Sequence, residues 1–181
     1  SVHAVPDSGL RDYLLRSLHP FVGFVSSFAL VGCYWLLHYV MFHLITHVTR
    51  MLVVLNALFL FCVTFVPFPT GLQAVYRNDE VAFALYGATH SVCALSLLAL
   101  WAYASSDHRL IYPDVPQALI ISVRRRVIIM SAVSVAAVGV SFLNLTVARL
   151  MFLSIPVLVI SHRLVAAGWQ PATSLDDGTP A

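Results

Sequence analysis

Residues 51–72 have the sequence MLVVLNALFLFCVTFVPFPTGL, which contains no charged side chain. A helix of this length extends about 33 Å, enough to cross the hydrocarbon core of a bilayer. Pro67 and Pro69 lie near its end, and a proline inside a helix removes a backbone donor and kinks or breaks the helix. The stretch therefore predicts a membrane-spanning helix that is interrupted near its exit from the hydrocarbon.

Similar apolar stretches on both sides predict further spans. Two of them cover 21–45 and 81–104, and the second ends in Trp101 and Tyr103, which suit an aromatic belt at the membrane interface. A third apolar stretch, 127–160, would be about 50 Å long as one helix, so it must be divided. Asn144 beside Ser141 is the natural turn, which gives helices over 127–143 and 145–160. The longest connection is expected at 105–126 and carries Arg124, Arg125 and Arg126.

This pattern predicts an all-α fold, a polytopic membrane helix bundle with about five transmembrane helices. The composition agrees, because the chain is 60% hydrophobic and 10% charged, with a mean hydropathy of +0.87. Lipid must solvate much of such a surface. A formal net charge of +2 is too small and too scattered for a nucleic-acid-binding surface, so no nucleic-acid partner is expected.

The transmembrane domain is predicted over 20–167, with a short segment on each side. Residues 1–19 form a surface linker or an amphipathic helix over 5–18, with Ser8 as its N-cap. Residues 168–181 contain Trp169 and two prolines and are predicted to be a disordered tail.

Arginine placement predicts the orientation, because cytoplasmic segments carry an excess of basic residues. With Ser1 outside, the inner segments hold Arg50, Arg109, Arg124, Arg125, Arg126 and Arg163, and the outer ones hold Arg11, Arg16, Arg77 and Arg149. We therefore expect an outside N-terminus and a cytoplasmic C-terminus. No signal peptide precedes Pro20, so this orientation predicts a further helix before Ser1.

The sequence holds no constellation typical of an enzyme. There is no GxSxG, HExxH or glycine-rich phosphate loop, and no carboxylate lies inside a predicted span, which also disfavours a proton-coupled transporter. Cys33, Cys62 and Cys93 fall inside separate apolar stretches without the spacing of metal ligands. We expect no catalytic site, no metal site and no cofactor.

Eight histidines in a hydrophobic chain raise the alternative of a haem-bearing electron carrier. His38 lies about 25 Å from the outer end of its helix, whereas His90 lies about 14 Å from the outer end of an oppositely directed helix. Axial ligands to one iron must face each other at one level, so these depths disfavour haem.

Trp35, His38 and Asn56 lie near the inner ends of two consecutive predicted helices. A hydrogen-bonded cluster between these helices is expected, since polar side chains stabilise contacts between membrane helices. Direct contact with a ligand is the less favoured alternative.

Three segments together carry a resemblance to a known family. They are LVGCYWLLHYVMFHLI at 30–45, MLVVLNALFLFCVTFVPFPTGL at 51–72 and VAFALYGATHSVCALSLLALWAYA at 81–104. With Trp35, His38, Asn56 and the run from Phe65 to Thr70, the chain resembles the transmembrane-protein-175 potassium channel family over Pro20 to about Leu164. The spans correspond to the second through sixth helices of the six-helix bacterial members.

The resemblance implies a potassium-permeable channel subunit of the passive leak type in a bacterial plasma membrane, assembled as a homotetramer. In that family the first helix carries an Arg and Phe-Ser-Asp signature and lines the pore, and that signature does not occur between Ser1 and Ala181. We therefore expect this first helix to be lacking and carry over no pore-lining residue, and Trp35, His38 and Asn56 would brace that helix. A non-conducting membrane scaffold or partner subunit is the alternative.

Overall fold

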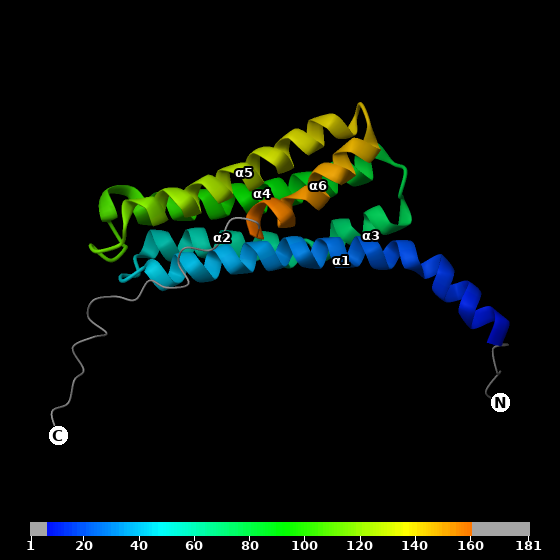
Figure 1. The fold of residues 1–181 in the computed structure, drawn as a ribbon, viewed down its shortest axis with the longest axis horizontal. Helices are drawn as coiled ribbons and strands as arrows, with labels where there is room; N and C mark the ends of the chain where they lie inside the picture. The colour runs from blue at the N-terminus through cyan, green and yellow to red at the C-terminus, as the bar shows by residue number, and fades with distance from the viewer. Residues whose placement is uncertain (1–6, 161–181) are drawn as a thin grey trace, which may run out of the picture.

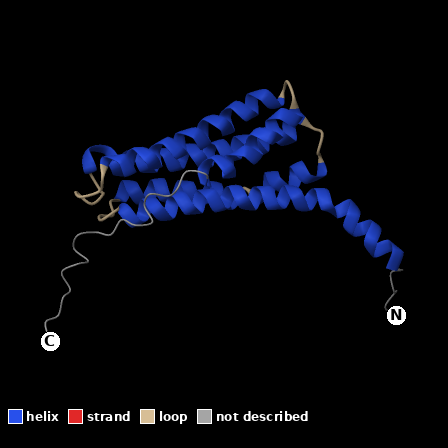
Figure 2. Cartoon of the chain, in the orientation of Figure 1, coloured by secondary structure: helices blue, strands red, loops and turns tan. Residues whose placement is uncertain are grey.

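The computed structural model describes residues 7–160, and every regular element in that range is a helix (Figure 2). The elements in chain order are α1 (Asp7–Leu44), α2 (Arg50–Phe65), α3 (Pro67–Val75), α4 (Glu80–Ser105), the short 3-10 helix η1 (Ser106–His108), α5 (Gln117–Ser141) and α6 (Leu145–Ile160). The predicted all-α fold is confirmed.

Side-chain caps define where several of these helices begin. The backbone N–H of Leu52 donates to Thr49 Oγ1 (3.3 Å) at the start of α2, and the N–H of Ala82 donates to Asp79 Oδ1 (2.8 Å) at the start of α4. Asn144 Oδ1 accepts from backbone N–H groups of α6 at 3.0 and 3.1 Å. Each cap satisfies donors that the first helical turn leaves unpaired.

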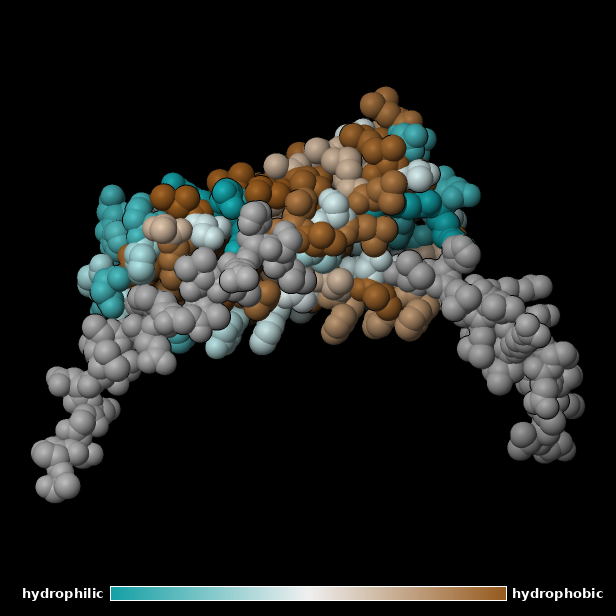
Figure 3. Space-filling model, in the orientation of Figure 1, coloured by the Kyte–Doolittle hydropathy of each residue, from teal (hydrophilic) through white to brown (hydrophobic). Residues whose placement is uncertain are grey.

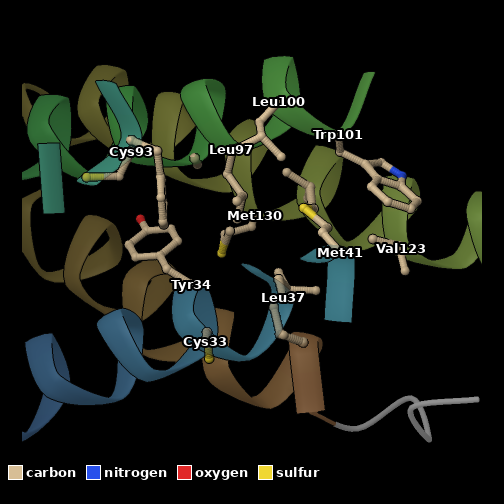
Figure 4. Packing of buried hydrophobic residues seen from close by; sticks show 14 of the residues in the cluster. Cys33, Tyr34, Leu37, Met41, Cys93, Leu97, Leu100, Trp101, Val123 and Met130 are labelled. Carbon is tan, nitrogen blue, oxygen red and sulfur yellow. The ribbon is translucent and has the colours of Figure 1, made fainter. Parts of the chain in front are cut away.

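The helices pack side by side, and α4 lies at the centre of the bundle. Its backbone approaches α5 and α2 most closely, α5 in turn packs on α6, and α1 runs along the opposite side of the bundle (Figure 1). The core between α1, α4 and α5 contains Tyr34, Met41, Leu97, Trp101 and Met130 (Figure 4). Helix α4 is extensively buried because it contacts several helices at once.

Three helical segments are long and apolar enough to cross a membrane, namely Gly23–Leu44, Arg50–Val75 and Glu80–His108. Leu145–Val159 is a shorter apolar helix. Hydrophobic side chains cover much of the middle of the bundle, and hydrophilic ones gather toward its two ends (Figure 3). This distribution is that of an integral membrane protein whose ends lie in the two polar interfaces.

Most predicted breaks are found where the sequence placed them. The second span is divided at Val66, directly before Pro67, and the last apolar stretch is divided between Ser141 and Leu145. The N-terminal part differs from the expectation of a separate surface segment, because α1 continues without interruption from Asp7 to Leu44.

The predicted connection over 105–126 is wrong in its second half. Helix α5 begins at Gln117, directly after Pro116, so the arginine triplet lies on a helix. Arginine is a good helix former and no proline or glycine follows until Gly139, so the helix extends well before its apolar part. Hydropathy marks where lipid begins, which is not where a helix begins.

The aromatic-belt prediction is wrong for Trp101. This side chain is 0% exposed, and its indole Nε1–H donates to the carbonyl oxygen of Ile120 (3.4 Å). Tyr103 is half-buried, with the Arg109 guanidinium 5.2 Å from its ring centroid. Helix α5 packs against Trp101, which gives this side chain a protein environment.

The division into segments 1–19, 20–167 and 168–181 stays a prediction. The predicted tail 168–181, together with 161–167 and 1–6, lies outside the described residues.

Candidate functional site

The structure brings His38 of α1 and Asn56 of α2 together. His38 Nε2 donates to Asn56 Oδ1 (2.8 Å), because the amide oxygen can only accept. The imidazole stacks on Phe42 and Phe59, with ring centroids 4.3 and 5.3 Å away. Helix α1 presents His38 at this point and α2 returns beside it after the short connection 45–49, so the pair joins two consecutive helices inside an aromatic surround.

Trp35 lies one turn before His38 on α1. Its side chain is 66% exposed and stacks on Tyr39, with centroids 5.8 Å apart, and Tyr39 in turn stacks on His43 at 6.3 Å. The three predicted site residues therefore divide into a hydrogen-bonded pair, His38 and Asn56, and an outward-facing indole. Together they mark one strip of the bundle, where a polar pair borders an exposed aromatic stack.

The surface of α1 and α2 around this strip is strongly apolar. Phe28 is 70% exposed on α1, and Phe61 is 68% exposed on α2. Such side chains require lipid or another protein helix as their neighbour. The strip is thus suited to contact with a further hydrophobic helix.

A second polar cluster lies in the core and was missed from the sequence. Tyr34 Oη donates to the backbone carbonyl of His90 (3.0 Å) and lies 3.1 Å from His90 Nδ1. One hydroxyl can serve both groups if Nδ1 carries the hydrogen and donates to it. Both side chains are 0% exposed, and Tyr86 and Phe152 enclose the imidazole with centroids at 4.5 and 5.7 Å.

No feature of the sequence pairs these two residues, because they are 56 positions apart on helices that first meet in the folded bundle. The only signal is that His90 lies among small residues of its helix, which is typical of a packed face. His90 is thus a core residue with a partner of its own.

The histidines and cysteines are placed separately. Cys33, Cys62 and Cys93 are free and buried. Within 7–160, no group of three or more His, Cys, Asp or Glu side chains is arranged to hold a metal ion. His38 and His90 engage different partners on different helices.

These features define a class: an integral membrane bundle of helices with a polar pair beside an exposed aromatic strip. The sequence model of the family described as "Endosomal/lysosomal potassium channel TMEM175" matches residues 1–67. A potassium channel of Streptomyces collinus is 32% identical over 164 residues, which cover 87% of this chain and 74% of the relative. A potassium channel of Chamaesiphon minutus is 33% identical over 106 residues, 57% of this chain and 52% of that protein.

The fold comparison agrees with the sequence comparison. The crystal structure of a lysosomal potassium-selective channel TMEM175 homolog from Chamaesiphon minutus superimposes with a TM-score of 0.74 at 24% identity, covering 85% of this chain and 79% of that one. The chain belongs to the TMEM175 family.

Proposed function

We propose that this chain is a subunit of a potassium-permeable channel of the passive leak type. The observation that carries the proposal is the match to the Streptomyces collinus relative, which is named a potassium channel and is aligned over 87% of this chain. The placement of charge supports a passive pathway, because Asp79, Glu80, Asp107 and Asp114 lie at helix ends and connections, and the candidate span Gly23–Leu44 contains no acidic residue. Coupled transport commonly relies on carboxylates inside the membrane.

We assign to Trp35, His38 and Asn56 a positioning role rather than contact with the ion. The His38–Asn56 hydrogen bond joins α1 to α2, and the exposed Trp35 ring beside it offers an apolar surface to a further helix. A pore helix packed on this strip would be held at a defined angle and depth. The subunits would then assemble as a homotetramer around four such helices.

The orientation we propose has the N-terminus outside and the C-terminus in the cytoplasm of the bacterial cell. Connections 45–49 and 106–116 meet at one end of the bundle, where the N–H of Thr46 donates to the carbonyl of Leu110 (2.8 Å). That end carries Arg50, Arg109, Arg124, Arg125 and Arg126, and Arg77 and Arg149 lie toward the other end. The positive-inside rule places the arginine-rich end in the cytoplasm.

Potassium flux into proteoliposomes tests the proposal. The protein is reconstituted with a potassium gradient, and flux is followed with a voltage-sensitive dye. We expect flux that needs no proton or sodium gradient, and a mass in native mass spectrometry of four subunits. His38→Leu should change the flux per tetramer, while Phe61→Leu, on the exposed face of α2, should not.

An intact oligomer that passes no potassium would contradict the proposal and support a non-conducting scaffold. Cysteine labelling checks the orientation independently. If a cysteine placed at Arg124 reacts with an impermeant reagent added outside the cell, the proposed orientation is wrong.

A further inference from the structure

A cavity of about 870 Å³ lies between α1, α3, α4 and α6, at the end of the bundle opposite connections 45–49 and 106–116. Its walls are mostly apolar and include Phe24, Phe28, Phe83 and Phe152. Gly23 and Gly71 also line it, and a Cβ added at either would meet no atom within 4 Å. The volume falls within the range of about 300–1,000 Å³ that small-molecule sites occupy.

The hydroxyl groups in this cavity already bond to one another. Thr70 Oγ1 donates to the carbonyl of Val66 (2.8 Å) and lies 3.4 Å from Ser27 Oγ, which lies 3.3 Å from Tyr86 Oη, so the chain of hydroxyls links α3, α1 and α4. Because these groups have partners, the inner part of the cavity does not require a polar ligand. An apolar chain lying against the phenylalanines would leave no hydroxyl unpaired.

Two arginines line the cavity, and none of its lining residues in the described part of the chain is acidic. A guanidinium N–H of Arg149 donates to the backbone carbonyl of Arg77, so the two residues meet at one part of the cavity lining. Asp79 follows closely in sequence, but its carboxylate caps α4 by accepting from Ala82 (2.8 Å). Two cations at an apolar cavity, with no carboxylate among its described lining residues, favour an anion as the occupant.

We propose that this cavity binds one anionic phospholipid. The headgroup phosphate contacts Arg77 and Arg149, and an acyl chain lies along Phe24 and Phe28 over Gly71. Basic pockets between membrane helices recognise anionic headgroups in this way on the cytoplasmic side, and the proposed orientation places this one in the outer leaflet. A hydrophobic helix as occupant would leave the two arginines without a counter-charge, so the charge favours lipid.

Native mass spectrometry of the protein in detergent, titrated with phosphatidylglycerol or phosphatidylcholine, tests the proposal. We expect one phosphatidylglycerol per subunit, bound at least tenfold more tightly than phosphatidylcholine. Arg77→Gln should weaken phosphatidylglycerol binding about fivefold, since a basic residue near an anionic headgroup contributes about 1 kcal/mol. Gly71→Leu should weaken it by placing a side chain in the part of the cavity where the acyl chain lies.

Matched controls separate this site from general surface binding. Arg124→Gln removes the same charge from an exposed position of α5, and Gly139→Leu adds the same side chain where a Cβ meets nothing within 4 Å. Both should bind phosphatidylglycerol as the parent protein does. Equal affinity for the two lipids, or equal losses in Arg77→Gln and Arg124→Gln, would overturn the proposal. So would a Gly71→Leu variant that dissociates the oligomer in lipid-free detergent, because the occupant would then be protein.

Discussion

Helices α2 and α4 lie side by side, yet the more hydrophobic of the two is the less buried. The span Arg50–Val75 has a mean hydropathy of 2.4 and only 22% of its apolar segment is buried, while Glu80–His108 has 1.6 and 61%. In water the opposite order would be expected. In a bilayer, lipid solvates apolar side chains as well as protein does, so burial follows close packing and hydrogen bonding instead.

The residues of the two helices show this difference. The buried side of α4 is rich in small and polar residues, among them Gly87, Thr89, Ser91, Ala94 and Ser96. The Ser91 hydroxyl has a hydrogen-bond partner within the helix, because it donates to the carbonyl of Gly87 (2.8 Å). The exposed side of α2 carries large apolar residues instead, including Val54, Leu58 and Phe61. Helix α4 can approach several helices, whereas α2 leaves most of its surface uncovered by the other described helices.

The largest expected effect is that of Trp101→Ala on α4. The side chain is 0% exposed, so truncation leaves a cavity, and we expect the free energy of unfolding in mixed micelles to fall by about 3 kcal/mol. Phe61→Ala on α2, where the ring is 68% exposed, should change it by less than about 0.5 kcal/mol. Similar losses at the two positions would remove the distinction between the helices.

Gly87→Leu tests how closely α4 is packed. Even a Cβ at Gly87 would lie 2.7 Å from Val138 Cγ2 and 3.5 Å from the Phe152 ring. Valine has little rotamer freedom in a helix, so α4 and α5 must separate, and we expect a loss of about 2 kcal/mol. Gly32→Leu on α1, where a Cβ meets nothing within 4 Å, serves as the control in the same unfolding titration. A stable Gly87→Leu variant would show that the α4–α5 contact is loose.

The polar pair His38–Asn56, which joins α1 to α2, should contribute less than the core of α4. We expect His38→Leu to lower the free energy of unfolding by about 1 kcal/mol, the usual scale for hydrogen bonds between membrane helices. Asn56→Leu and the double variant complete a thermodynamic cycle, in which the coupling should be about 0.6 kcal/mol or more. Strictly additive losses would mean that the 2.8 Å contact does not stabilise the fold.

The smallest effects are expected at the N-caps, where the two helices should behave alike. Thr49→Ala removes the cap of α2 and Asp79→Ala that of α4. Each should cost about 0.5 kcal/mol, because a cap acts locally whatever the burial of the helix beyond it. Thermal melts in detergent would measure both. A much larger loss for Asp79→Ala would show that the contrast between the helices extends to their ends.

Local chemistry explains which parts of the fold could be predicted. Apolar length located the spans, Pro67 predicted the break at Val66, and Asn144 predicted the turn before α6, where its side chain caps the helix at 3.0 Å. His38 and Asn56 could be paired because a short connection returns α2 beside α1. Each of these depends on residues within about 20 positions of one another, so no knowledge of the bundle is needed.

The rest depended on contacts between distant segments. Tryptophan at the end of a span is typical of the membrane interface, but α5 covers Trp101. The Tyr34–His90 cluster and the cavity lined by Arg77 and Arg149 form only where helices far apart in the sequence meet. The sequence by itself therefore determined that lipid surrounds much of the chain, that the fold is all-α and where most helices break, because these properties follow from hydropathy and backbone chemistry. Only the tertiary structure decided which apolar helix lies inside, because lipid and protein are nearly equivalent surroundings for apolar side chains and packing geometry makes the choice.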